Sequence, residues 1–311
     1  MRILLIVLAF CLSTFATAAP LNKIVVFGDS LSDNGNLYEY MKQALPMSPP
    51  YYEGRFTNGP VWIELLTKMY YPDDAQAHLL DYAFGGAGVL EGSDDDEDDE
   101  DVLFTLRREV DSYLVSHQDK ADESSLYVVW MGANNYLAVP DDADEAVYYT
   151  NLGIQHDLQR LVDKGAKHIM VVNLPDLGKT PAARDFESVE LLTLLSKKHN
   201  AKLLENLNTF KQNNPGVQWL YFDVNQILDE MLTYPEHFGF TNITDTCYDE
   251  MLVEPSQKTI LSMVSTVKSR VKGNVCEGYL FFDPVHPSEV AHQLMAQTTK
   301  DMLDAAGVTF E

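Results

Sequence analysis

Basic residues are scarce in this chain, and their scarcity argues against several classes of partner. Its 311 residues include 22 lysines and arginines against 47 aspartates and glutamates, for a formal net charge of −25. A chain of this charge repels the phosphates of nucleic acids and is not drawn tightly to anionic lipid surfaces. We therefore expect no nucleic-acid partner, and the charge fits a protein that diffuses freely.

Long apolar segments are almost absent as well. One occurs at residues 3–12, between the single charge of Arg2 and the small residues Ala16-Thr-Ala18. It is shorter than the roughly 20 residues that a membrane-spanning helix needs, and its flanks are those of a secretory signal peptide. We expect residues 1–18 to be removed by cleavage after Ala18. The predicted protein is secreted, into the periplasm or out of the cell.

Cysteine is the third shortage. The chain has three cysteines, and Cys11 lies in the predicted signal peptide, which leaves Cys247 and Cys276. In an oxidising compartment such a pair predicts a disulfide, which here closes a loop over residues 247–276. Two cysteines without nearby histidines make a poor zinc site, and the histidines show no metal-ligand spacing. We therefore expect no metal and no cofactor.

The residues after the signal peptide contain no repeat and no Pro/Gly-rich linker, so we expect one domain over residues 19–311. Short apolar runs alternate with longer amphipathic stretches, which is typical of parallel strands covered by helices on both faces. The predicted fold class is α/β, a flavodoxin-like three-layer α/β/α sandwich around a mostly parallel five-stranded sheet. The expected strands are Ile24–Phe27, Leu79–Tyr82, Leu126–Trp130, His168–Val172 and Val217–Phe222. The expected helices include Val61–Tyr70, Leu103–Ser116, Glu145–Lys164, Val189–Gln212, Val224–Thr233 and Ser288–Ala306.

An acidic loop insertion at about residues 91–101 interrupts this pattern. Its carboxylates run without a break from Asp94 to Asp101, so they repel one another and are expected to be solvated. The run lacks the spacing and the glycine turn of an EF-hand. The non-enzymatic alternative for the whole chain is a secreted protein that binds calcium or a partner through this segment.

The first strand leads into a candidate nucleophile. Gly28-Asp-Ser30 forms a short polar turn between that strand and a helix. A serine at such a turn projects its hydroxyl from the sheet edge and leaves its own N–H free to meet an anion. The alternative for Ser30 is that it merely caps a helix.

A carboxylate and an imidazole stand three residues apart near the end of the chain, in Asp283-Pro-Val-His286. Residues i and i+3 on a helical turn or a tight loop face the same side. Asp283 can therefore hold the Nδ1 proton of His286 while Nε2 faces outward as a base. Serine, histidine and aspartate together make an activated hydroxyl nucleophile, and the alternative for His286 is a cap on the last helix.

Two further strand ends carry donors for an oxyanion. The run from Asp81 to Gly88 is rich in glycines, which let the backbone approach a ligand closely. The run from Val128 to Asn135 ends in a small turn with carboxamides. In a parallel sheet both ends lie on the edge that carries Ser30, where ligands bind. Acyl transfer needs such donors for the negative charge that develops on the carbonyl oxygen.

Together these runs resemble the GDSL-type serine esterases of the SGNH hydrolase superfamily, in the branch that holds secreted bacterial lipases, phospholipases and acyltransferases. The resemblance covers nearly the whole mature chain. Gly28-Asp-Ser-Leu31 is similar to the first family block and Asp283-Pro-Val-His286 to the last. The stretches 54–62 and 173–181 are also similar to segments typical of this branch. Asn135 departs from the third block, which usually has aspartate at that position.

The resemblance implies a triad of Ser30, His286 and Asp283, with an oxyanion hole formed by the backbone N–H of Ser30, by Gly86 and by Asn134. It implies a lipid or lysophospholipid substrate, and the expected enzyme is a lysophospholipase A or phospholipase A that works through an acyl-enzyme. Two alternatives are a glycerophospholipid:cholesterol-type acyltransferase and a short-chain or carbohydrate acetyl esterase. We expect transient contact with membrane surfaces or micelles and no obligate protein partner.

Two finer expectations concern the surroundings of the site. Arg55 is a candidate contact for the polar head of a substrate, and an ordinary salt bridge is its alternative. Cys276 closely precedes Asp283, so the disulfide is expected to constrain the acid and base. The loop 247–276 is accordingly a candidate lid over the acyl-chain groove.

Overall fold

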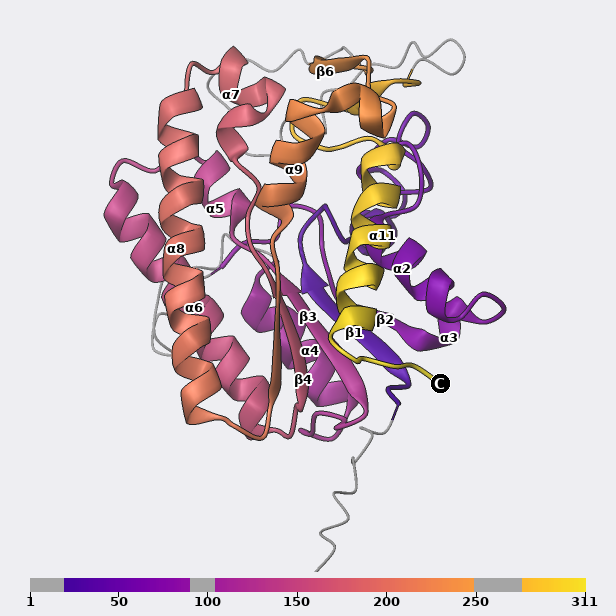
Figure 1. Cartoon of the computed structure of the whole chain (residues 1–311), viewed down its shortest axis with the longest axis vertical. Helices are drawn as coiled ribbons and strands as arrows, with labels where there is room; N and C mark the ends of the chain where they lie inside the picture. The colour runs from indigo at the N-terminus through magenta and orange to yellow at the C-terminus, as the bar shows by residue number, and fades with distance from the viewer. Residues whose placement is uncertain (1–19, 90–103, 249–275) are drawn as a thin grey trace, which may run out of the picture.

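The computed structural model describes residues 20–89, 104–248 and 276–311 (Figure 1). The predicted signal peptide, the acidic run from Asp94 to Asp101 and nearly all of the loop between the two cysteines lie outside the described residues. The expectations for these three segments therefore stay predictions. Within the described ranges, no helix is both long and apolar enough to cross a membrane.

A sheet of five parallel strands lies at the centre of the molecule, in the order β2-β1-β3-β4-β5. This is the flavodoxin-like order, in which the winding reverses between β1 and β3, and it confirms the predicted fold class. Each strand overlaps one of the five expected ones. The strands are β1 (Lys23–Gly28), β2 (Leu79–Asp81), β3 (Ser125–Trp130), β4 (His168–Val172) and β5 (Gln218–Phe222).

Each face of the sheet packs against its own core, because successive residues of a strand point to opposite faces. In β1, Ile24 and Val26 belong to one core, whereas Val25 and Phe27 belong to the other. The strands are consequently apolar at nearly every position, as parallel strands buried on both faces must be.

Helices cover both faces of the sheet and form the outer layers of the sandwich. Figure 1 shows α9 and α11 in front of the sheet and α4 behind it. The core that contains Ile24 packs against α2 (Trp62–Tyr70), α9 (Val224–Thr233) and α11 (Glu289–Ala305). The opposite core packs against α4 (Leu106–Ser116), α6 (Ala143–Asp163) and α8 (Val189–Asn213). All six helices were expected from the apolar periodicity, with small differences at their ends.

Side-chain caps explain two of these differences. Asp142 accepts hydrogen bonds from the backbone N–H groups of Asp144 (2.9 Å) and Glu145 (3.0 Å), so α6 begins before its expected start. Thr105 accepts one from Arg108 N (3.3 Å), so α4 begins after its expected start. Caps satisfy N–H groups that have no partner within the helix, and apolar periodicity does not report them.

The elements that the sequence did not predict are short. They are too short to show a helical or strand period, which needs several turns or alternations to be recognised. The helical ones are α1 (Asn36–Tyr40), α3 (Ala75–His78), α5 (Ala133–Leu137), α7 (Pro181–Asp185), η1 (Leu177–Lys179) and η2 (Pro235–Phe238). The strands β6 (Asn242–Thr246) and β7 (Tyr279–Phe281) form a separate two-stranded parallel sheet.

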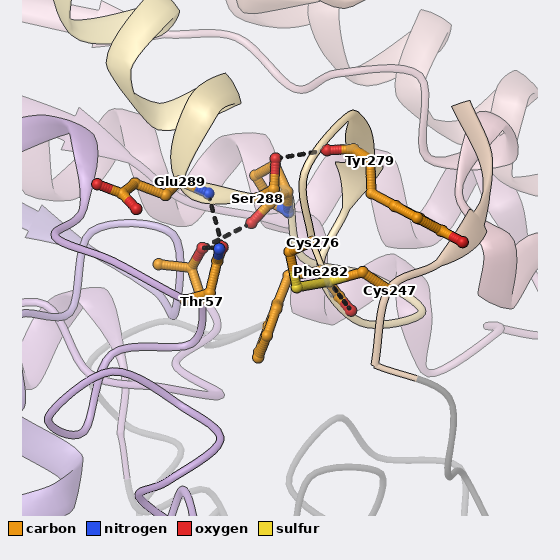
Figure 2. The surroundings of a disulfide bond; sticks show 9 residues. Thr57, Cys247, Cys276, Tyr279, Phe282, Ser288 and Glu289 are labelled. Atoms are coloured by element: carbon orange, nitrogen blue, oxygen red, sulfur yellow. Dashed lines mark hydrogen bonds between the residues drawn. A yellow bond between two sulfur atoms is a disulfide. The ribbon is translucent and has the colours of Figure 1, made fainter. Parts of the chain in front are cut away.

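A disulfide joins Cys247, just after β6, to Cys276, just before β7 (Figure 2). This is the pairing that the sequence analysis expects. The backbone N–H of Cys247 also donates to the carbonyl of Phe281 (3.1 Å). The disulfide therefore links the end of β6 to the segment that enters β7, the strand that leads into Asp283.

Candidate active site

Ser30 lies on a tight turn directly after β1. The carbonyl of Asp29 accepts hydrogen bonds from the backbone N–H groups of Ser32 and Asp33, both at 3.0 Å. A Cβ at Gly28 would lie 3.1 Å from the carbonyl oxygen of Trp130 on β3, so a larger residue would push the strands apart. The turn thus places Ser30 at the carboxyl edge of the sheet, where the sequence predicted it.

Asp283 and His286 belong to one compact turn after β7. Oδ1 of Asp283 accepts hydrogen bonds from the backbone N–H groups of Val285 (2.9 Å) and His286 (2.8 Å). Oδ2 lies 2.6 Å from Nδ1 of His286. The carboxylate therefore fixes the backbone of the turn with one oxygen and the imidazole ring with the other.

The structure brings Ser30 and the Asp283–His286 turn together, although they lie at opposite ends of the chain. Oγ of Ser30 is 2.7 Å from Nε2 of His286. Because Nδ1 donates its proton to Asp283, Nε2 is the acceptor and the Ser30 hydroxyl donates. All three side chains are nearly buried, with 4% of Ser30, 1% of His286 and 3% of Asp283 exposed.

The Asp283 carboxyl is held in its ionised form. Burial alone would raise its pKa, but the charge and ring N–H of His286 and the backbone N–H groups of Val285 and His286 lower the pKa below its usual value. An ionised carboxylate beside Nδ1 stabilises the imidazolium that forms when Nε2 takes a proton.

Asn134 is the second expected group that the structure brings to this place. It lies in the first turn of α5 and lines the same cavity as Ser30 and His286. Its Nδ2 donates to the carbonyl of Ala87 (2.6 Å), and an amide nitrogen carries a second hydrogen. Gly86 precedes Ala87 with φ of +80°, a conformation that favours glycine. Gly86 itself is not among the residues that line the cavity.

Asn135, the departure from the family pattern, holds the same loop. Its Oδ1 accepts from the backbone N–H of Val89 (2.9 Å) and its Nδ2 donates to the carbonyl of Val89 (2.8 Å). An aspartate would satisfy only the N–H and would face the carbonyl oxygen with a negative charge. The substitution therefore keeps the loop after β2 attached to α5.

The cavity beside Ser30 is lined mainly by apolar side chains. Its volume is about 760 Å³ when the space at its solvent-open mouth is included. Its polar lining residues are Ser30, Asn134 and His286, together with Asp29 and Thr180. The apolar lining comes mainly from α5, α9, α11 and β7: Ala133, Leu137, Val224, Ile227, Leu228, Met231, Leu280, Phe281, Ala291 and Met295.

Asp33 connects the Ser30 turn to the loop that carries Gly86. Its Oδ1 accepts from the backbone N–H groups of Gly35 (2.8 Å) and Asn36 (2.6 Å), and its Oδ2 accepts from Gly85 N (2.7 Å). Burial raises the pKa of this carboxyl to about 6 against these hydrogen bonds. Asp33 was not predicted as a site residue, because its partner Gly85 lies 52 residues away on the loop after β2.

More buried carboxyl groups surround the end of β1. Burial raises the pKa of Asp29 to about 6, and it raises the pKa values of Asp81 and Glu109 well above their usual range. Glu109 Oε2 accepts from the backbone N–H of Gly28 (2.8 Å). Its position on the buried stripe of α4, between Leu106 and Val110, was the sequence signal for an inward-facing acid.

Arg55 takes the salt bridge that the sequence analysis gave as its alternative. Its guanidinium pairs with Glu64 (2.6 Å) and donates to the carbonyl of Glu53 (2.7 Å). Arg55 is not among the residues that line the cavity. Contact with a substrate head group therefore stays an untested expectation.

Comparisons with known proteins agree with this geometry. Residues 24–298 match the family model described as GDSL-like lipase/acylhydrolase. A phosphatidylcholine-sterol acyltransferase from Aeromonas hydrophila is 32% identical over 91% of this chain and 90% of that protein. The secreted effector protein SseJ of Salmonella typhimurium is 27% identical over 89% of this chain, which spans 62% of that longer protein.

Among solved structures, a carbohydrate acetylesterase from Sinorhizobium meliloti, Est24, superposes with a TM-score of 0.50 at 12% identity. The superposition covers 92% of this chain and 99% of that one, and it supports the fold alone. The family match, by contrast, extends from β1 to α11 and includes Ser30, Asn134 and the Asp283–His286 turn. The chain belongs to the GDSL-like lipase/acylhydrolase family, whose members are acyl ester hydrolases and acyltransferases.

Proposed function

We propose that Ser30 is the nucleophile of an acyl-enzyme mechanism in which His286 is the base and Asp283 orients it. Nε2 of His286 takes the hydroxyl proton as Oγ of Ser30 attacks the ester carbonyl carbon. The tetrahedral oxyanion is held by Asn134 and by the backbone N–H groups of Ser30 and Gly86. Collapse expels the alcohol, which receives the proton from His286, and water then hydrolyses the acyl-enzyme by the same steps.

We further propose that the acyl group is that of a lipid, with lysophospholipids or phospholipids as the substrates. The observation that carries this proposal is that the Ser30–His286 pair lines a cavity whose other lining residues are mainly apolar. A hydrocarbon chain gains free energy by leaving water for such a lining. An acetyl group would leave most of the apolar lining without a contact. The cavity therefore favours substrates with long acyl chains over substrates with short ones.

Two measurements on the purified protein test these proposals. A fluorophosphonate probe should label wild type at Ser30 and leave Ser30→Ala unlabelled. Hydrolysis of lysophosphatidylcholine, phosphatidylcholine vesicles and p-nitrophenyl acetate should show higher kcat/KM for the long-chain lipids. Labelling at another residue would contradict the nucleophile, and hydrolysis of the acetyl ester alone would contradict the lipid substrate.

Transfer of the acyl group to a sterol is a second candidate function. It is favoured by the relative from Aeromonas hydrophila, which is named a phosphatidylcholine-sterol acyltransferase and is covered over nine-tenths of its length. An apolar cavity also limits the access of water to the acyl-enzyme, which helps an alcohol to compete. Incubation of the protein with phosphatidylcholine vesicles, with and without cholesterol, distinguishes the two reactions. Formation of cholesteryl ester would support acyl transfer, whereas release of free fatty acid alone would identify a hydrolase.

We also propose that the protein is exported. The pattern at residues 1–18, the disulfide and the name of the Salmonella typhimurium relative all support an oxidising compartment. Mass spectrometry of the exported fraction should find a chain that begins at Ala19. A chain retained in the cell with Met1 in place would contradict export.

A further inference from the structure

Tyr51 makes a contact with the acid–base turn that the proposed mechanism does not use. Its hydroxyl lies 2.8 Å from Oδ2 of Asp283, the oxygen that also accepts the ring N–H of His286. Only 2% of Tyr51 is exposed. Tyr51 lies 232 residues before Asp283 in the sequence, so the contact depends on the tertiary fold.

This contact completes the hydrogen bonding of the carboxylate. An ionised carboxylate offers about four acceptor positions. Three are filled from within the turn itself, by Val285 N, His286 N and His286 Nδ1. The fourth is filled by the Tyr51 hydroxyl. Without it, a buried negative charge would keep an unsatisfied acceptor, which is costly in free energy.

Aromatic packing fixes the Tyr51 ring in the position that delivers its hydroxyl. The ring lies edge-on to those of Phe282 (5.1 Å between centroids) and Tyr248 (6.1 Å). It also contacts Phe56 (6.1 Å), whose ring lies 5.3 Å from the His286 imidazole. The hydroxyl and the imidazole are thus positioned by one aromatic cluster.

The loop that carries Tyr51 also holds the other end of the acid–base segment. The Thr57 hydroxyl donates to the carbonyl of Pro287 (2.8 Å), and Oδ1 of Asn58 accepts from Glu289 N (2.8 Å). Figure 2 shows Thr57 against the start of α11, beside Ser288 and Glu289. The loop 51–58 therefore brackets Asp283 and His286 from both sides.

We propose that Tyr51 is a positioning residue for the Asp283–His286 pair. Its hydroxyl stops the carboxylate from rotating and offsets part of the negative charge that faces the imidazole. His286 is then held with Nε2 towards Ser30, and the imidazolium is not stabilised so strongly that it fails to release its proton. This inference rests on the proposed function and assigns a role in that same site.

Other titratable groups lie near Asp283, His286 and Tyr51, and they contribute to any pH profile of the enzyme. Asp29 faces His286 from the turn after β1, and His292 faces it from α11. Tyr248 faces Tyr51 from the segment after β6. Burial, together with the charge of Asp283, raises the pKa of Tyr51 well above its usual value, so its hydroxyl stays a donor. The other groups are unchanged in the variant described next, so differences from wild type report on the Tyr51 hydroxyl.

The test is Tyr51→Phe, which removes the hydroxyl and keeps the ring. We expect kcat to fall about tenfold with little change in KM, because Tyr51 is not among the residues lining the cavity. The acid limb of the pH profile of kcat/KM should move to higher pH, because an unbalanced carboxylate holds the imidazolium more strongly. Tyr52→Phe is the matched control and should leave both quantities unchanged.

A second readout does not depend on turnover. The ring signals of His286 in protein with isotope-labelled histidine can be identified by their loss in His286→Asn. In Tyr51→Phe these signals should titrate at higher pH than in wild type. An unchanged titration, or a loss of thermal stability without a change in the pH dependence, would overturn the role of Tyr51. A wild type without esterase activity would instead contradict the proposed function, and the titration would still decide for Tyr51.

Discussion

The two halves of the candidate site are held by different kinds of structure. Ser30 and Asn134 follow the adjacent strands β1 and β3, which are paired in continuous register from Lys23 with Ser125 to Gly28 with Trp130. Asp283 and His286 follow β7, a three-residue strand outside the main sheet. The contact of Tyr51 with Asp283 spans 232 residues of sequence, and the contact of Thr57 with Pro287, the residue after His286, spans 230.

The difference indicates how each half responds to change. Backbone pairing of β1 with β3 positions the strand ends of the nucleophile half, and side chains such as Glu109 and Asp33 then hold the turn that follows β1. The acid–base half depends on individual side chains of a loop and on the disulfide beside β7. We therefore expect substitutions of residues outside the reacting groups to lower activity less in the nucleophile half than in the acid–base half.

The largest effect should come from breaking the bond that joins the halves. Ser30→Ala, His286→Ala and the double variant should each lose about 10⁴–10⁶-fold in kcat, and the double variant should lose no more than the singles. Residues that act as one unit are not additive. Ser32→Ala, two residues away, is the control: it removes the acceptor of the Trp62 indole N–H (3.1 Å) and should lower stability while it keeps most activity. Losses that multiply in the double variant would show that the two side chains act independently.

A smaller effect should separate the two neighbouring asparagines of the nucleophile half. Asn134→Ala should lower kcat about 10²–10³-fold, the usual cost of one oxyanion donor. Asn135→Ala should mainly lower stability, because it leaves the N–H and the carbonyl of Val89 without their partners. Steady-state kinetics and thermal unfolding of both variants measure this. Equal losses of kcat would mean that the two residues act only by holding the loop after β2.

The candidate catalytic residues of both halves could be predicted from the sequence, whereas the residues that hold the acid–base half could not. The same pattern occurs at Gly28 and at Gly132, where a strand is followed by a glycine and a polar turn. In a parallel sheet such strand ends lie at one edge. Asp283 and His286 were found because they are three residues apart. Local sequence patterns were therefore sufficient to predict Ser30, Asn134, Asp283 and His286 as candidate site residues.

Tyr51 and Asp33 could not be predicted in the same way. Tyr51 reaches Asp283 through ring packing with Phe282 and Tyr248, from segments that no local period connects. Asp33 binds N–H groups on both its own turn and the loop after β2. Such contacts depend on the angle at which irregular segments cross, and neither composition nor periodicity encodes that angle.

Removal of the Cys247–Cys276 disulfide would measure how much this bond stabilises the acid–base half. Replacing Cys247 and Cys276 together by serine should lower the free energy of unfolding by about 3–4 kcal/mol, the chain-entropy value for a loop of this length. Urea unfolding of the double variant and of reduced wild type should agree. A loss below about 1 kcal/mol in both would show that the β6–β7 pairing alone holds the segment.

The smallest predicted effect contrasts the carboxyl groups of the two halves. Asp283 has a lowered pKa because His286 and backbone N–H groups outweigh its burial, whereas burial dominates at Asp29 and raises its pKa to about 6. A folded-state pKa above the ordinary value of 3.8 means that the folded protein binds the proton more tightly than the unfolded chain does. This contribution to stability is present below about pH 4 and is lost as the pH rises through about 6.

Asp29→Asn should remove that dependence, because an asparagine Oδ1 can still accept the backbone N–H of Leu31 but carries no charge. Relative to wild type, the variant should gain up to about 3 kcal/mol in unfolding free energy between pH 4 and pH 7. Asp33 and Asp283 are present in both proteins, so their contributions cancel in the difference. Urea unfolding at four pH values measures it. A pH-independent difference would mean that Asp29 ionises normally, and the two halves would then differ in geometry but not in electrostatics.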